Sequence, residues 1–176
     1  MEDYATYLPP LVLTHQEGHT PPKQKPTIFW IGCCDAKVSE AEVLPEKEIF
    51  VQRNIANQFQ AIDANALASL AYAVSLSTID EIMIVGHTDC GGVQACYDVA
   101  QGKARPPLHW SLWNWLHGLT ILAKAHTKLT PYQLTQLNVI QQVNNVRAVL
   151  GTLTNRPLKV GGYLYDIVEK KLVVVE

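Results

Sequence analysis

The sequence predicts an α/β protein with a mainly parallel β-sheet flanked by helices on both faces. Short apolar runs of strand length occur at residues 27–31, 48–52 and 81–85. A helical pattern at 63–78 stands between the last two runs. Strand–helix–strand spacing of this kind is typical of a right-handed crossover between parallel strands. The first run is apolar on both of its faces, as expected of a central strand in a parallel sheet.

Capping residues mark two of the predicted helices. Asp63 is placed to cap the helix at 63–78. Apolar residues surround this helix and form no single stripe, so both of its sides are expected to be buried. Residues 130–133, Thr-Pro-Tyr-Gln, form a capping box with proline at the first helical position. Gly151 is placed to end the helix that starts there.

The remaining elements complete a single domain. Further helices are predicted at 93–100 and 108–126, and further strands at 159–167 and 172–175. Residues 1–26 contain five of the ten prolines and are predicted to form an extended N-terminal arm. Residues 27–176 are predicted to fold as one α/β domain, because a chain of 176 residues has ample length for one core.

The composition excludes several classes of partner. A net charge of −2 provides no basic surface for nucleic acid or anionic lipid. No apolar run reaches the ~18 residues typical of a membrane span. Charged residues make up 17% of the chain, against about 25% in typical soluble domains. This deficit, with 48% apolar residues, indicates surface that is buried between subunits of a homo-oligomer.

The chain start and the cysteine content indicate a reducing compartment. The first ten residues, MEDYATYLPP, lack the basic and apolar regions of a secretory signal. Four cysteines without such a signal favour reduced thiols that serve metal binding or catalysis over a disulfide framework. We therefore expect a cytoplasmic protein.

Metal-binding side chains gather where two of the predicted strands end. The candidate ligands, in chain order, are Cys33, Cys34, Asp35, His87 and Cys90. Two thiolates, one imidazole and one exchangeable position make a catalytic zinc site. The following helix should aim backbone N–H groups at Cys90 and favour its thiolate form. Spacing alone does not choose between Cys33 and Cys34, although strand alternation predicts that only one of them reaches the metal.

Each of these residues also has an ordinary structural interpretation. A cysteine at a strand end is commonly a small buried hydrophobe, and Cys96 on the next helix fits that role. Asp35 could be a turn carboxylate and Arg53 a surface charge. A thiol redox protein using Cys33 and Cys34 is a further alternative, but the chain lacks the usual Cys-x-x-Cys spacing.

Taken together, the motifs resemble those of the β-class carbonic anhydrases. Residues 32–37, Gly-Cys-Cys-Asp-Ala-Lys, are similar to the family's Cys-x-Asp-x-Arg signature, and residues 87–92, His-Thr-Asp-Cys-Gly-Gly, are similar to its His-x-x-Cys-Gly-Gly. Residues 50–57, 72–74 and 162–166 also match in order and spacing. The resemblance covers roughly residues 27–168 and implies a β-carbonic anhydrase-like fold.

The resemblance implies a catalytic zinc centre. Cys33, His87 and Cys90 become the ligands of one Zn²⁺ ion per chain, so the domain at 27–176 would be a zinc-binding one. Zinc-bound hydroxide would hydrate carbon dioxide to bicarbonate. Asp35, positioned by Lys37, would orient the hydroxide or move in as a fourth ligand. The sequence departs from the family at Lys37, where an arginine is usual. A lysine should hold Asp35 less firmly, because it lacks the planar two-pronged grip of arginine.

The resemblance leaves two alternative activities. Some relatives of this family hydrolyse carbonyl sulfide or carbon disulfide with the same zinc ligands. A weakly active zinc-binding homologue, altered at Lys37, is the other alternative. All three interpretations imply a small linear gas as substrate and a homodimer or homotetramer.

Overall fold

The computed structural model describes residues 23–176 and contains one five-stranded sheet with the order β2-β1-β3-β4-β5. Residues 1–22, where most of the predicted N-terminal arm lies, are outside the described residues. The strands are β1 (Ile28–Cys33), β2 (Ile49–Asn54), β3 (Glu81–His87), β4 (Lys159–Asp166) and β5 (Lys171–Val174). Neighbouring strands pair in parallel except β4 and β5, which are antiparallel. The predicted α/β class and the mainly parallel sheet are therefore confirmed.

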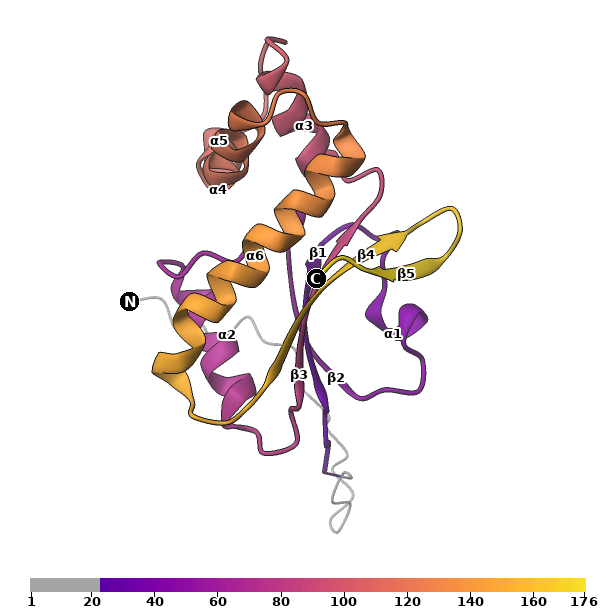
Figure 1. Ribbon diagram of the computed structural model, residues 1–176, viewed down its shortest axis with the longest axis vertical. Helices are drawn as coiled ribbons and strands as arrows, with labels where there is room; N and C mark the ends of the chain where they lie inside the picture. The colour runs from indigo at the N-terminus through magenta and orange to yellow at the C-terminus, as the bar shows by residue number, and fades with distance from the viewer. Residues whose placement is uncertain (1–22) are drawn as a thin grey trace, which may run out of the picture.

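The helices are distributed unequally around this sheet (Figure 1). They are α1 (Glu40–Val43), α2 (Ala64–Ser75), α3 (Gly91–Ala100), α4 (Trp110–Trp115), α5 (His117–Ala125) and α6 (Pro131–Leu153), with a 3₁₀ turn η2 (Ile55–Asn57) after β2. The long α6 runs across one face of the sheet beside α2, whereas α3, α4 and α5 gather beyond one end of the strands (Figure 1). The other face is covered by the short α1 and neighbouring loops.

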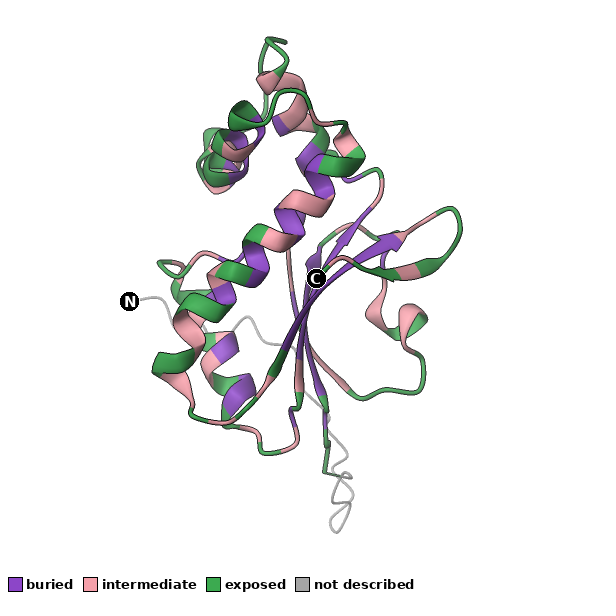
Figure 2. Cartoon of the chain, viewed as in Figure 1, coloured by how far each residue is buried: buried purple, intermediate pink, exposed green. Residues whose placement is uncertain are grey.

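The main hydrophobic core lies between the sheet and the pair α2 and α6. Phe29 and Ile31 of β1 pack there with Ile82 and Ile84 of β3. Alternate residues of the same strands, such as Trp30, form a smaller core on the opposite face. The central strands are buried along nearly their whole length (Figure 2). This burial fixes the strand ends in place, and the candidate ligands lie at those ends.

Both predicted helix caps are present. Asp63 accepts a hydrogen bond from the backbone N–H of Asn65 at 3.1 Å. At the start of α6, the Thr130 hydroxyl accepts from the N–H of Gln133, and the Gln133 side chain accepts from the N–H of Thr130. These reciprocal bonds satisfy donors that the first helical turn would otherwise leave unpaired.

Two predicted helix boundaries are wrong. The helix predicted at 108–126 is divided into α4 and α5 at Leu116, which has a backbone ψ of 7° and a buried side chain. The carbonyl of Trp115, just before this bend, accepts a hydrogen bond from Gln60 Nε2 at 2.8 Å. Gly151 does not end α6, which continues to Leu153 because its backbone stays helical. The extended Thr154 follows instead.

The expectation that α2 is buried on both sides is also wrong for the single chain. Ala66, Leu70 and Ala73 face the core, but Tyr72 keeps 59% of its surface exposed. The apolar residues of α2 therefore form one buried face and one open face.

In residues 23–176, no helix combines the length and the apolar character needed to cross a membrane.

Candidate metal centre

Three side chains with ligand atoms meet at the carboxyl edge of the sheet. Cys33 and His87 are the last residues of β1 and β3, which are neighbouring parallel strands. Cys90 stands at the N-cap of α3. All three side chains are buried, and their donor atoms lie within 4.8 Å of one another. The structure thus brings together the three residues whose types favour zinc, because adjacent parallel strands end at the same edge.

The His87 ring is oriented by its backbone neighbour. Its Nδ1 lies 2.8 Å from the carbonyl oxygen of Thr88. Since a carbonyl only accepts, Nδ1 carries the proton and Nε2 keeps its lone pair. Nε2 is buried, and among residues 23–176 it has no hydrogen-bond partner. An unpaired buried nitrogen is costly, and a bound cation would satisfy it.

The spacing of the two sulfur atoms fits a tetrahedral zinc ion. Cys33 Sγ and Cys90 Sγ are 4.0 Å apart. Two sulfurs at the usual zinc–sulfur bond length of about 2.3 Å, at a tetrahedral angle, would be about 3.8 Å apart. The donor set of two thiols and one imidazole is likewise one that zinc prefers.

Electrostatics at this pair also favour a cation. The hydrogen bond from the Cys90 thiol holds the pKa of Cys33 well below its usual range, against the effect of burial. The same hydrogen bond, with burial, raises the pKa of Cys90. The N–H groups of Val93 and Gly92 oppose this rise, so the predicted effect of the helix amides exists but is outweighed. Binding of a divalent cation would displace the thiol proton of this pair.

Cys34 is separated from this group although it follows Cys33 directly. Its side chain is exposed, and burial followed by the charge of Cys33 raises its pKa. It lines a cavity of about 460 Å³ together with Arg53, Ile55 and Trp115. The alternation predicted for the strand end is confirmed, since only one of the two thiols faces His87.

Asp35 lies next to the three clustered residues and takes part in a turn. Its Oδ1 accepts a hydrogen bond from the backbone N–H of Lys37 at 2.9 Å. The Lys37 ammonium is 3.7 Å from Asp35 Oδ2, and it lies closer, at 3.2 Å, to Asp89 Oδ2. The hydrogen bond to Asp89 is the main reason why the pKa of Lys37 is raised. The sequence contained no signal for this contact, because Asp89 is 52 residues away from Lys37.

Arg53 holds the loop that follows Cys33 by hydrogen bonds, and the interpretation as a plain surface charge is wrong. Its Nε donates to the carbonyl of Cys33 at 2.8 Å, and its terminal nitrogen donates to the carbonyl of Asp35 at 2.6 Å. The same guanidinium lies 3.7 Å from Glu40. One signal was available: Arg53 is the next-to-last residue of β2, and the parallel sheet places it beside the end of β1.

Buried amide side chains, one in the loop itself and one on α6, hold the loop that packs on the candidate ligands. Ala56, in η2, has a left-handed backbone (φ 61°) and packs with Cys33 and Cys90. Its carbonyl accepts hydrogen bonds from Gln58 Nε2 at 2.7 Å and Asn138 Nδ2 at 3.1 Å. Its N–H helps to lower the pKa of Cys33. The sequence gives no signal for Asn138 in this role, because polar positions on a helix usually indicate its solvent-facing side.

Known proteins share sequence and fold with this chain. The sequence profile described as "Carbonic anhydrase" matches residues 28–172. A carbonic anhydrase of Candida albicans is 30% identical over 168 residues, which are 87% of this chain but only 57% of that protein. The chain therefore spans just over half the length of this relative. A carbonic anhydrase of Saccharomyces cerevisiae is 30% identical over 173 residues, 89% of this chain and 77% of that protein.

Among solved structures, a tetrameric β-carbonic anhydrase of Sordaria macrospora superimposes with a TM-score of 0.74. The two chains are 28% identical, and the match covers 86% of this chain and 81% of that one.

Proposed function

Because this chain belongs to the β-carbonic anhydrase family, we propose that it hydrates carbon dioxide to bicarbonate with the help of a Zn²⁺ ion. The observation that carries this proposal is the buried group of Cys33, His87 and Cys90, which offers two sulfurs and one unpaired imidazole nitrogen. A zinc ion bound there would lower the pKa of a water molecule and make it a nucleophile near neutral pH.

The residues of the site have separate roles in this proposal. Cys33 and Cys90 would bind the ion as thiolates, and His87 would bind it through Nε2. The carbonyl of Thr88 fixes the orientation of the imidazole ring, as outer hydrogen bonds commonly do at zinc sites. Asp35 would accept a hydrogen bond from the attacking water and so orient its lone pair toward the substrate carbon. Lys37 would keep the Asp35 carboxylate in place for this task.

One assay tests the choice of substrate. We expect kcat/KM for carbon dioxide to exceed that for carbonyl sulfide on the same zinc-loaded preparation. The two gases differ by one oxygen-to-sulfur exchange, and a pocket separates such similar shapes by only ~1–3 kcal/mol. A preference for carbonyl sulfide of more than tenfold would replace the proposed substrate and leave the metal centre intact. A fully loaded protein that turns over neither gas would contradict the proposed activity itself.

The proposed enzyme works as a homo-oligomer, and an exposed apolar surface supports this. The surface joins α2 to the edge strand β2 and includes Ile55, Ile62 and Tyr72, of which Ile62 is 93% exposed. The Tyr72 ring packs at a tilt against Phe50 of β2, with 5.6 Å between ring centroids, so an aromatic contact links the helix to the edge strand. Exposed apolar surface of this kind commonly marks an interface between subunits. A second copy of the chain is the occupant we propose.

A single substitution tests this interface. Light scattering should report a dimer or a larger even assembly for the wild type. A stable contact between subunits of this kind buries at least ~1,000 Å² of surface. Tyr72→Glu should shift the protein toward monomer because it places a charge in the proposed apolar contact. Tyr132→Glu is the matched control, since Tyr132 is 46% exposed on α6. A wild-type protein that remains monomeric at micromolar concentration would contradict the proposal.

A further inference from the structure

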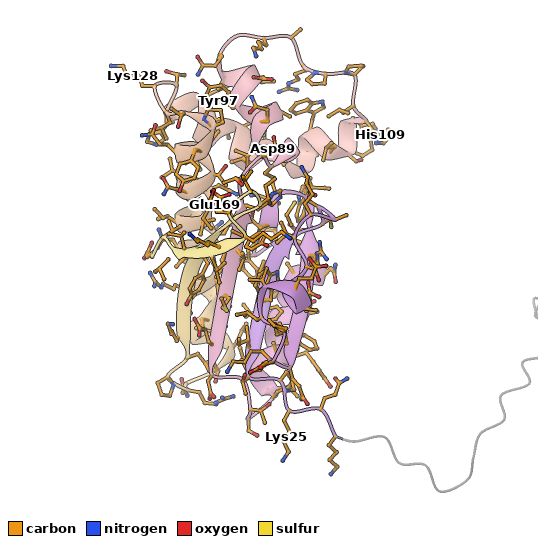
Figure 3. The ribbon with its side chains drawn as sticks, turned by 90° about the vertical axis from the view of Figure 1, so that its right-hand side faces the viewer. Lys25, Asp89, Tyr97, His109, Lys128 and Glu169 are labelled. Carbon is orange, nitrogen blue, oxygen red and sulfur yellow. The ribbon has the colours of Figure 1, made fainter. Side chains whose placement is uncertain are left out.

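One lysine is shared between two carboxylates at the edge of the metal centre. Lys37 Nζ lies 3.2 Å from Asp89 Oδ2 and 3.7 Å from Asp35 Oδ2. Asp89 stands between His87 and Cys90 in the chain and has a left-handed backbone with φ 57°. Figure 3 shows Asp89 where the sheet ends and the helical part of the molecule begins. The closer partner of Lys37 is therefore not the proposed catalytic carboxylate.

We propose that Asp89 is a positioning residue that competes with Asp35 for Lys37 and thereby sets how firmly Asp35 is held. This inference rests on the proposed function, because it concerns the carboxylate that would orient the attacking water. Asp89 touches neither substrate nor metal in this role. It acts only through the ammonium group of Lys37.

The chemistry of lysine makes such competition effective. An ammonium group is a point charge on a flexible stem, so it moves to whichever carboxylate attracts it more. An arginine would hold one carboxylate with two parallel hydrogen bonds and would be harder to divert. The backbone N–H of Lys37 also donates to Asp35 Oδ1, so the ammonium group supplies only part of the restraint on this carboxylate.

The size of the effect follows from solvent exposure. The Lys37 side chain is 50% exposed and that of Asp89 is 78% exposed, so water and salt screen their attraction. Exposed ion pairs of this kind contribute little, and a change of partner should shift equilibria by about two- to fivefold.

The direction of the expected effect follows from how easily an external ligand reaches the metal. When Asp89 no longer attracts Lys37, the ammonium serves Asp35 alone and restrains its carboxylate from moving onto the metal. With a metal bound by Cys33, His87 and Cys90, a fourth ligand position would then stay open to an external ligand. Removing the charge of Asp89 should therefore make that position easier to occupy.

Azide binding to cobalt-substituted protein measures this access, because an anion bound to cobalt changes its visible absorption. We expect Asp89→Asn to bind azide about two- to fivefold more tightly than the wild type. Asparagine suits the test because it tolerates the left-handed backbone and removes only the charge. Asp98→Asn is the matched control. Asp98 forms an exposed pair with Lys103 at 2.8 Å on the outer part of α3, and this variant should bind azide as the wild type does.

A second background separates competition from plain loss of negative charge. The Lys37→Gln protein has no ammonium group to redirect. In this background, Asp89→Asn should therefore change azide affinity much less than it does in the wild type. Equal tightening in both backgrounds would overturn the inference, as would azide affinity in Asp89→Asn equal to that of the wild type. A wild-type protein that binds neither cobalt nor zinc would overturn the proposed function and the inference with it.

Discussion

Replacing His87 with alanine should remove bound zinc and reduce carbon dioxide hydration to the uncatalysed rate. His87 Nε2 is the one nitrogen donor of the buried group, and the alanine side chain offers no replacement. Two thiols alone are too few ligands, because a catalytic zinc site usually has three protein donors. Metal analysis should give about one zinc ion per chain for the wild type and nearly none for His87→Ala. Full zinc content in the variant would show that the metal lies elsewhere.

The neighbouring cysteines provide a matched pair for the same experiment. Cys33→Ser should lose zinc, because a hydroxyl is a poor substitute for a thiolate at a zinc site. Cys34→Ser makes the same chemical change one residue later and should keep nearly normal zinc, since the Cys34 side chain is exposed and separated from the group. The reverse result would move the proposed ligand by one position along the chain.

Parallel strand topology explains why much of the site was predictable from the sequence. Apolar strands that end in reactive residues place those residues at one edge, so Cys33 and His87 were expected to lie near each other. Strand alternation separated the roles of Cys33 and Cys34 only once the direction of one side chain was known. That direction depends on which face of the sheet becomes the larger core, and this is decided by the packing of α2 and α6.

The supporting contacts were not predictable, because each joins residues that are far apart in the chain. Lys37 meets Asp89 only after the two strand-end loops come together. Arg53 reaches the Cys33 carbonyl only because β2 pairs with β1 in register. The division between α4 and α5 likewise depends on the burial of Leu116 and on a hydrogen bond from Gln60.

The polar side of α6 is the clearest case of a pattern that the tertiary structure reverses. Asn138 and Gln142 would be read as solvent-facing residues of a surface helix, yet both are buried. The loop around Ala56 has backbone groups that no strand or helix can pair. The amide side chains supply the missing partners, because buried polar backbone must be hydrogen-bonded. The spacing of apolar residues shows which face of a helix packs on the core. It does not show which polar residues form hydrogen bonds with the backbone of a distant loop.

Asn138→Ala should therefore be among the most damaging single substitutions, although it removes only a small polar group. Asn138 is fully buried. Its Oδ1 accepts from Gln58 Nε2 at 2.7 Å and from Gln142 Nε2 at 3.0 Å, while its Nδ2 donates to the Ala56 carbonyl. Alanine leaves these groups with fewer partners and opens a small void. We expect the free energy of unfolding in urea to fall by about 2–3 kcal/mol.

Asn144→Ala on the same helix gives the control for that measurement. Asn144 is exposed, and alanine is the better helix former, so this variant should be unchanged or up to about 0.5 kcal/mol more stable. Zinc affinity distinguishes a local role from a general one. Asn138→Ala should bind zinc more weakly even where it remains folded, because Ala56 packs on the cysteine pair and its N–H helps to lower the pKa of Cys33. Equal losses of stability in the two variants would mean that the buried amides do not hold this loop.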